Sequence, residues 1–187
     1  MIQHLGIANS TRATVADLYG VQGKAELVDG EIVIMSPASF GHGRKSSRIY
    51  QCLLAYEQQT NRGRAVPDNV GFLVDLPHRQ SFSPDAGYFF GSIKPDEFLL
   101  GAPAFAAEVR SPEDFGPVAE RAMAAKRADY FAAGTQVVWD VDMLREMVVR
   151  VYRAATPLLP KVYGLGEIAE AEPALPGWTM AVSDILK

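Results

Sequence analysis

The sequence predicts an α/β fold in which a central mixed β-sheet is flanked by two long helices and preceded by an N-terminal β-hairpin. A hairpin signal at Asp29-Gly30 is the first observation. The second is a helical pattern over about 40–60 and again from Pro117 to about Ala133. The third is a series of short apolar runs around these helices, which are typical of strands.

The hairpin is the clearest local signal. Residues 24–28 and 31–35 are strand-like and flank Asp29-Gly30. A type I′ turn needs a positive φ at both central positions, and this residue pair is favoured there. Residues 1–13 are weakly patterned and are expected to be loosely held, whereas 14–20 fit a short helix with an approximate capping box.

Each long helix is predicted by its apolar face and by the residues at its ends. In the first, these residues recur at helical spacing and share one face: His42, Ser46, Ile49, Leu53 and Tyr56. The second begins at Pro117, because proline is favoured in a first turn, and ends before Gly134. The expected strands lie at 64–67, 70–75, 85–90, 104–110, 135–141 and 147–153, with a last strand and turn in 172–186.

Length and composition set limits on the class of protein. The 187 residues suit a single domain over 1–187, and 48% apolar with 21% charged residues is an ordinary globular composition. Cys52 is the only cysteine, which excludes an intrachain disulfide and a zinc site with several cysteines. The start of the chain lacks a signal-peptide pattern, and no apolar run is long enough to span a membrane. A cytoplasmic protein without membrane contact is expected.

The formal net charge of −4 gives no overall attraction to nucleic acid. Basic residues do gather locally, at Arg44, Lys45 and Arg48 and further on at Arg62 and Arg64. They form either a phosphate-contacting patch or a solvated helix face, and charge alone favours the helix face. Carboxylates that chelate a cation would also lower the formal charge, so its sign does not exclude a nuclease.

Three charged residues stand in apolar surroundings. Asp85 opens an apolar strand, and Glu108 lies among alanines on another. Because an unpaired carboxylate is costly to bury, Glu108 requires a cation or an arginine. Lys126 emerges from the apolar face of the second long helix. That helix follows the strand of Glu108 and is expected to pack back across its sheet, so the two side chains can meet.

Together these three residues have the chemistry of a metal-dependent phosphodiesterase. Two carboxylates on adjacent strands bind a hard divalent cation such as Mg²⁺, which polarises a phosphodiester and activates a water. A nearby lysine orients the water and offsets charge in the transition state. The alternative is a buried ion pair of Glu108 with Lys126, beside an unrelated turn aspartate. The sequence has no Gly-rich phosphate loop, so no organic cofactor is expected.

Longer stretches carry a family resemblance. They are 25–39, His42 with the helix that follows it, 83–89, 104–112, 126–142 and 174–186. Two motifs make the resemblance specific, because Glu-Val-x-Ser-Pro followed by Lys-x-x-x-Tyr-x-x-x-Gly is uncommon in other proteins. In these stretches the chain resembles the Uma-type restriction endonuclease family, formerly a domain of unknown function, of the PD-(D/E)XK nuclease superfamily. The resemblance implies a restriction-endonuclease-like fold and a metal-dependent endonuclease with DNA as its partner.

The resemblance also implies roles for single residues. Asp85 would be the aspartate of the PD motif and Glu108 the second acid, and both would bind Mg²⁺ or Mn²⁺ together with the carbonyl of Val109. Lys126 would be the catalytic lysine, moved in this family from the strand to the next helix. Three further positions would line or support the site: Glu26, His42 and Tyr130.

Arg110 departs from the family pattern, in which this position is usually aliphatic. Alternate strand residues share a face, so Arg110 is expected on the same side as Glu108. Either it binds the scissile phosphate, or it pairs with Glu108 and displaces the metal. The second case would leave a catalytically silent module that binds nucleic acid or acts as a dimeric scaffold. A homodimer within a larger system is a third alternative, by analogy with fold relatives.

Overall fold

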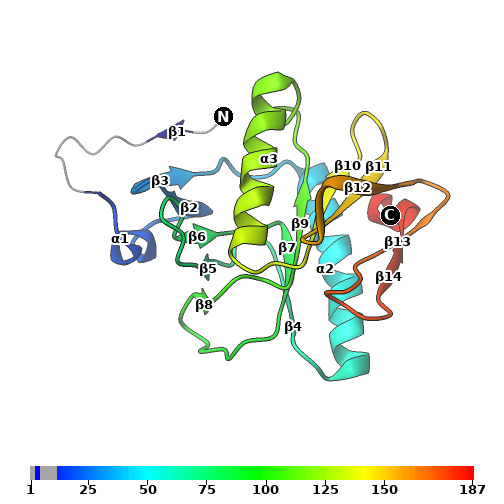
Figure 1. The fold of residues 1–187 in the computed structure, drawn as a ribbon, viewed down its shortest axis with the longest axis horizontal. Helices are drawn as coiled ribbons and strands as arrows, with labels where there is room; N and C mark the ends of the chain where they lie inside the picture. Colours follow the sequence, from blue (N-terminus) through cyan, green and yellow to red (C-terminus); the bar gives the residue numbers. More distant parts are fainter. Residues whose placement is uncertain (1–2, 5–11) are drawn as a thin grey trace.

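The computed structural model describes residues 3–4 and 12–187, and its centre is a six-stranded mixed sheet (Figure 1). The strands of this sheet are β4 (Arg64–Val66), β7 (Ala86–Phe89), β9 (Phe105–Val109), β10 (Val137–Asp142), β11 (Val148–Arg153) and β12 (Thr156–Gly164). They lie in the order β12-β11-β10-β9-β7-β4. β9 and β10 are parallel, whereas the other neighbours are antiparallel. The predicted central mixed sheet is therefore confirmed.

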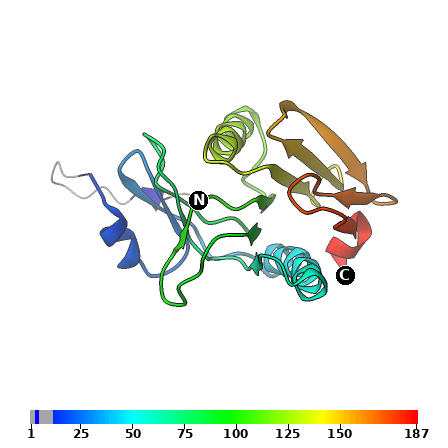
Figure 2. The ribbon, with the colours of Figure 1, turned by 60° about the horizontal axis from the view of Figure 1, so that its bottom comes forward.

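Two long helices cover opposite faces of this sheet (Figure 2). Helix α2 (Phe40–Thr60) buries Ile49 and Leu53 in one core cluster, while helix α3 (Pro117–Ala132) buries Tyr130 in the other. The side chain of Ser39 caps α2 at its start, and Asn61 ends the helix with a positive φ of 49°. Helix α3 connects the parallel strands β9 and β10, and its Tyr130 and Lys126 contact Glu108 of β9.

The predicted hairpin is present and crosses one end of the main sheet. β2 (Ala25–Val28) and β3 (Glu31–Ile34) pair on either side of Asp29 and Gly30, whose φ values are 53° and 78°. Helix α1 (Val15–Tyr19) begins with the expected capping box between Thr14 and Asp17. The expectation of a loosely held 1–13 falls mostly on residues 1–2 and 5–11, which lie outside the described residues. Gln3–His4 form β1, which pairs with β3.

Several short elements differ from the sequence prediction. The strand expected at 70–75 is only β5 (Phe72–Leu73), and it joins β6 (Ser81–Phe82) and β8 (Leu99–Leu100) in a separate small sheet. β12 was not predicted, because its exposed leucines and prolines hide the alternation that marks a half-buried strand. β13 (Ile168–Glu170) and β14 (Thr179–Ala181) form another pair, followed by the short helix η1 (Val182–Leu186).

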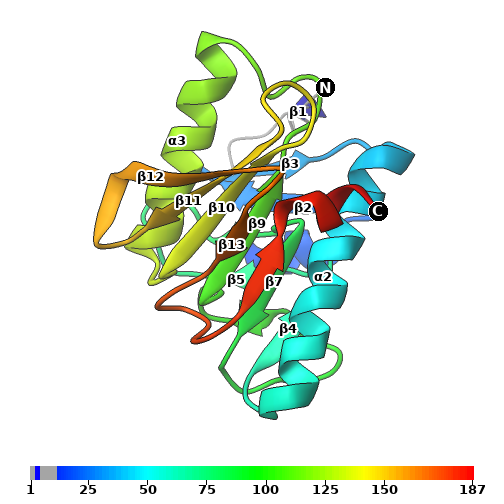
Figure 3. The same ribbon diagram turned by 90° about the vertical axis from the view of Figure 1, so that its right-hand side faces the viewer.

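The last segment of the chain completes the core on the face covered by α2 (Figure 3). Trp178 and Trp139 lie with their ring centroids 5.0 Å apart, and Leu175 and Ile185 are fully buried. Trp139 is fully buried in this core cluster. Among the described helices, none is long and apolar enough to cross a membrane.

Candidate functional site

The candidate site lies at the end of the main sheet where β9 stops and β7 starts. Asp85 immediately precedes β7, and its backbone N–H donates to the carbonyl of Ala107 at 3.1 Å. Glu108 is on β9, on the face that packs against α3. The two acids therefore come from adjacent antiparallel strands at neighbouring positions.

Asp85 is buried and has three partners. Its Oδ2 accepts a hydrogen bond from the N–H of Val109 at 2.7 Å, and its Oδ1 accepts one from Nζ of Lys24 at 2.6 Å. Nε2 of His42 lies 3.3 Å from Oδ2 and 2.9 Å from the carbonyl oxygen of Val109. Burial alone would raise the pKa of Asp85, but His42 and Lys24 outweigh it and hold the pKa well below its usual range. Asp85 is therefore an ionised carboxylate.

Glu108 is held from the side of α3. Its Oε1 accepts a hydrogen bond from the hydroxyl of Tyr130 at 2.6 Å and lies 2.9 Å from Nζ of Lys126. Burial raises the pKa of Glu108, and the negative charge of Asp85 adds to this, while Lys126 opposes it. The meeting of Glu108 with Lys126 that helix periodicity predicts is present in the structure.

Lys126 also binds a second acid, Glu26 of β2. Nζ of Lys126 lies 2.9 Å from Oε1 of Glu26, whose other oxygen pairs with Arg79 at 2.6 Å. Burial alone would lower the pKa of Lys126, but the two carboxylates raise it above its usual value. Arg79 in turn binds Asp129 of α3 at 2.8 Å. The ammonium of Lys126 is thus fixed beside Glu108 by a buried network.

Charges alternate along this network except at one place. One run joins Asp68, Lys24 and Asp85, and the other joins Glu108, Lys126, Glu26, Arg79 and Asp129. Where the two runs meet, the like charges Asp85 and Glu108 are neighbours; Asp85 raises the pKa of Glu108, and the single positive charge of Lys24 acts on both acids. Two like charges this close are unfavourable unless a cation joins them. A divalent ion would restore the alternation.

The donor set fits a hard cation such as Mg²⁺. Asp85, Glu108 and the carbonyl of Val109 offer oxygen atoms only, and a carbonyl that accepts from His42 keeps a second lone pair. No group of three or more His, Cys, Asp or Glu side chains suited to a metal occurs within 3–4 and 12–187. The side chains would therefore supply two ligands, which suits Mg²⁺ because it commonly keeps several waters.

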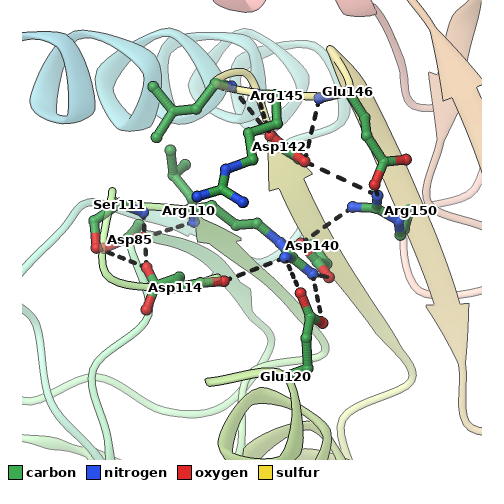
Figure 4. A network of polar contacts seen from close by, with 12 residues as sticks. Asp85, Arg110, Ser111, Asp114, Glu120, Asp140, Asp142, Arg145, Glu146 and Arg150 are labelled. Carbon is green, nitrogen blue, oxygen red and sulfur yellow. Dashed lines mark hydrogen bonds and ion pairs between the residues drawn. The ribbon is translucent and has the colours of Figure 1, made fainter. Parts of the chain in front are cut away.

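Arg110 has different partners from those expected (Figure 4). It lies on the same side of the sheet as Glu108, but its guanidinium binds Asp140 of β10 at 2.6 and 2.7 Å and also pairs with Glu120 of α3. Of the two alternatives that the sequence left open for Arg110, the pairing with Glu108 is therefore wrong. Asp140 stands opposite Glu108 in the parallel register of β9 and β10, so a second acid lies within reach on the same face. The side chain of Arg110 is only 4% exposed, and these ion pairs hold it in place.

Three further candidates from the sequence contact the site, and other polar residues have separate partners. Glu26, His42 and Tyr130 all contact the site, as described above. His78 is half-exposed and binds Asp129, and Asp142 accepts backbone hydrogen bonds in the turn after β10. In the basic cluster of α2, Arg44 binds the carbonyl of Lys187.

Lys24 and Asp68 were missed by the sequence analysis. Lys24 is two residues before Glu26, and this strand spacing places both side chains on one side of the hairpin, which is a signal that could have been used. Asp68 lies in the loop after β4 and has no such pattern. Its place in the site depends on the antiparallel pairing of β4 with β7, which brings the end of β4 beside Asp85.

Comparisons with known proteins agree with this architecture. A family model described as "Uma2: Putative restriction endonuclease" matches residues 14–183. A crystal structure of "a putative nuclease belonging to DUF820 from Anabaena variabilis ATCC 29413" is similar with a TM-score of 0.72 and 17% sequence identity. The similarity covers 92% of this chain and 97% of that one, and at this identity it shows the fold. No curated protein matches the chain.

Proposed function

The chain belongs to the Uma2 family, whose model is described as "Putative restriction endonuclease", and we propose that it is a metal-dependent endonuclease that hydrolyses DNA phosphodiester bonds. The observation that carries the proposal is the pair of adjacent acids, Asp85 and Glu108, with the ammonium of Lys126 2.9 Å from Glu108. Metal-dependent hydrolysis of a phosphodiester uses oxygen ligands and a cationic side chain of this kind.

In this proposal Asp85, Glu108 and the carbonyl of Val109 hold Mg²⁺ or Mn²⁺. The bound ion would offset charge on the phosphodiester and lower the pKa of a water. Lys126 stays protonated, since its pKa is raised, so it donates hydrogen bonds to the water or to a phosphate oxygen. It offsets negative charge as the transition state forms, and it does not act as a general base.

Three residues support this arrangement without contact to the reacting atoms. The hydroxyl of Tyr130 orients Glu108, and the ring of Tyr130 stacks on the ring of Phe82 with the two centroids 4.0 Å apart. Glu26 holds Lys126 from the opposite side. His42 contacts both Asp85 and the carbonyl of Val109, so it fixes their separation.

Plasmid nicking tests the proposal. Supercoiled plasmid is incubated with Mg²⁺ or Mn²⁺ and the wild type, Asp85→Asn or Lys126→Met, with Lys94→Met as a matched lysine control. Lys94 is exposed, and its ion-pair partner among the described residues is its near neighbour Glu97. We expect the two site variants to lose about 10²-fold or more in rate, as when a group that stabilises the transition state is removed. Equal nicking by all four proteins would mean that this site does not catalyse the hydrolysis.

A catalytically silent nucleic-acid-binding module is the second candidate, and one observation favours it. The ammonium of Lys24 contacts Asp85, so a cation already satisfies one of the two metal ligands. Arg110 no longer motivates this candidate, because it pairs with Asp140 and Glu120. Absence of both nicking and Mn²⁺ binding in the wild type, with DNA binding retained in a gel-shift assay, would favour the silent module.

A further inference from the structure

Lys24 contacts the oxygen of Asp85 that carries fewer other donors. Oδ2 of Asp85 accepts a hydrogen bond from the N–H of Val109 at 2.7 Å and lies 3.3 Å from Nε2 of His42, so Oδ1 is the more open oxygen for a cation. Nζ of Lys24 lies 2.6 Å from this Oδ1. An ammonium and a divalent ion at the same oxygen repel each other strongly in a partly buried site. Lys24 and a metal therefore compete for Asp85.

Lys24 has a second acceptor, Asp68. Its Nζ lies 2.7 Å from Oδ1 of Asp68, a side chain that is 31% exposed in the loop after β4. Burial alone would lower the pKa of Lys24, but Asp85, Glu108 and Asp68 raise it, so the side chain is a cation. Its long flexible stem allows the ammonium to leave one acceptor while it keeps the other.

From this geometry, and resting on the proposed function, we propose that Lys24 is an internal counter-ion of the metal-free site. Its ammonium neutralises Asp85 until a divalent ion binds, and it then withdraws to Asp68. Without Lys24, the buried carboxylate of Asp85 would keep only the N–H of Val109 and His42 as partners. Lys24 thus stabilises the fold before the metal arrives and weakens the affinity for the metal.

Calorimetric titration with Mn²⁺ tests this role. The proteins are the wild type, Lys24→Met, Asp68→Asn, the double variant and the control Lys94→Met. We expect Lys24→Met to bind Mn²⁺ about tenfold more tightly, which corresponds to about 1.4 kcal/mol. Asp68→Asn should bind more weakly, because Lys24 then has Asp85 as its remaining acceptor. Lys94→Met should bind like the wild type.

The double variant separates competition from a general charge effect. If Asp68 acts through Lys24, then Asp68→Asn has no effect once residue 24 is methionine, and the double variant binds as tightly as Lys24→Met. If Asp68 attracts the metal only by its charge, the loss of affinity is the same in both backgrounds. The second result would overturn the withdrawal of Lys24 to Asp68.

Thermal unfolding gives a readout that does not depend on calorimetry or activity. Metal-free Lys24→Met should melt below the wild type, because Asp85 loses its counter-ion, and saturating Mn²⁺ should raise its Tm by more than it raises that of the wild type. Lys24→Gln, which can still donate a hydrogen bond to Asp85, serves as the second variant if Lys24→Met does not fold.

The outcomes distinguish this inference from the proposed function. Equal Mn²⁺ affinity in the wild type and in Lys24→Met would overturn the role of Lys24 and leave the nuclease proposal standing. Binding in Lys24→Met but not in the wild type would support the counter-ion and favour the silent module. No binding in any variant would overturn the metal site itself, and the counter-ion with it.

Discussion

Arg110 and Lys126 are both cations between the main sheet and α3, but their acceptors give them different tasks. Lys126 binds Glu108 and Glu26 at the candidate site, whereas Arg110 binds Asp140 and Glu120 one strand away. Substitutions at Arg110 should therefore change stability and leave metal binding alone. Arginine suits this place because its planar guanidinium binds a carboxylate through two parallel hydrogen bonds.

Arg110→Met should destabilise the protein strongly. It would leave the carboxylate of Asp140, whose side chain is 3% exposed, with only Arg150 at 3.9 Å. Loss of one partner of a buried ion pair costs about 3–5 kcal/mol. In urea unfolding, Arg110→Met combined with Asp140→Leu should lose less than the sum of the two single variants, because no charge then stays unpaired. A cost below about 1 kcal/mol for Arg110→Met would contradict this account.

One carboxylate stabilises the turn between β10 and β11. Asp142 ends β10, and its buried carboxylate accepts hydrogen bonds from the N–H groups of Leu144 and Arg145 at 3.1 and 2.9 Å. Burial would raise the pKa of Asp142, but these backbone donors outweigh it and lower the pKa. The turn therefore depends on an ionised side chain.

Asp142→Asn should cost about 1–2 kcal/mol at neutral pH, since hydrogen bonds to a charged group are lost. Because the folded-state pKa is lowered, this stabilisation is complete above the unfolded pKa of about 3.9 and is lost as the pH falls through the folded pKa. The difference in unfolding free energy between wild type and variant should be constant from about pH 5 upward and shrink below about pH 4. Denaturant titrations over this range measure it, and a difference that grows on acidification would refute it.

Prediction from sequence succeeded where one element determines the outcome. The turn at Asp29-Gly30, the direction of Lys126 and the capping box at Thr14 each depend on spacing within a single hairpin or helix. Neither alternative for Arg110 named Asp140, because strand alternation gives the face of a side chain but not the acid that the neighbouring strand brings to that face.

The same limit explains the residues that were missed. Asp68 reaches the site only because β4 pairs with β7, and β5, β6 and β8 are too short to show a periodicity. Their pairings join residues far apart in the sequence, and a local pattern does not encode them.

The candidate site lies where three parts of the chain meet. β7 and β9 supply the acids, α3 supplies Lys126, and the hairpin of β2 and β3 brings Lys24 and Glu26 across the end of the sheet (Figure 1). On the opposite face, α2 and the C-terminal segment support the same strands from behind (Figure 3). The geometry of the acids therefore depends on packing that is far from them in the sequence.

Removal of 173–187 should abolish cooperative folding. This segment buries five large side chains in the main core: Leu175, Trp178, Met180, Val182 and Ile185. Each contributes about 1.5–3 kcal/mol on burial, so their combined loss is comparable to the net stability of about 5–15 kcal/mol of a whole domain. Trp139, fully buried beneath them, would also become exposed to water.

Thermal unfolding followed by near-UV circular dichroism should show a sigmoidal transition for the full chain and none for the truncated one. Removal of Leu186 and Lys187 alone is the control, because both are exposed, and it should leave the transition in place. A sharp transition in the longer truncation would mean that β7, β9 and α3 hold the site together without support from the opposite face.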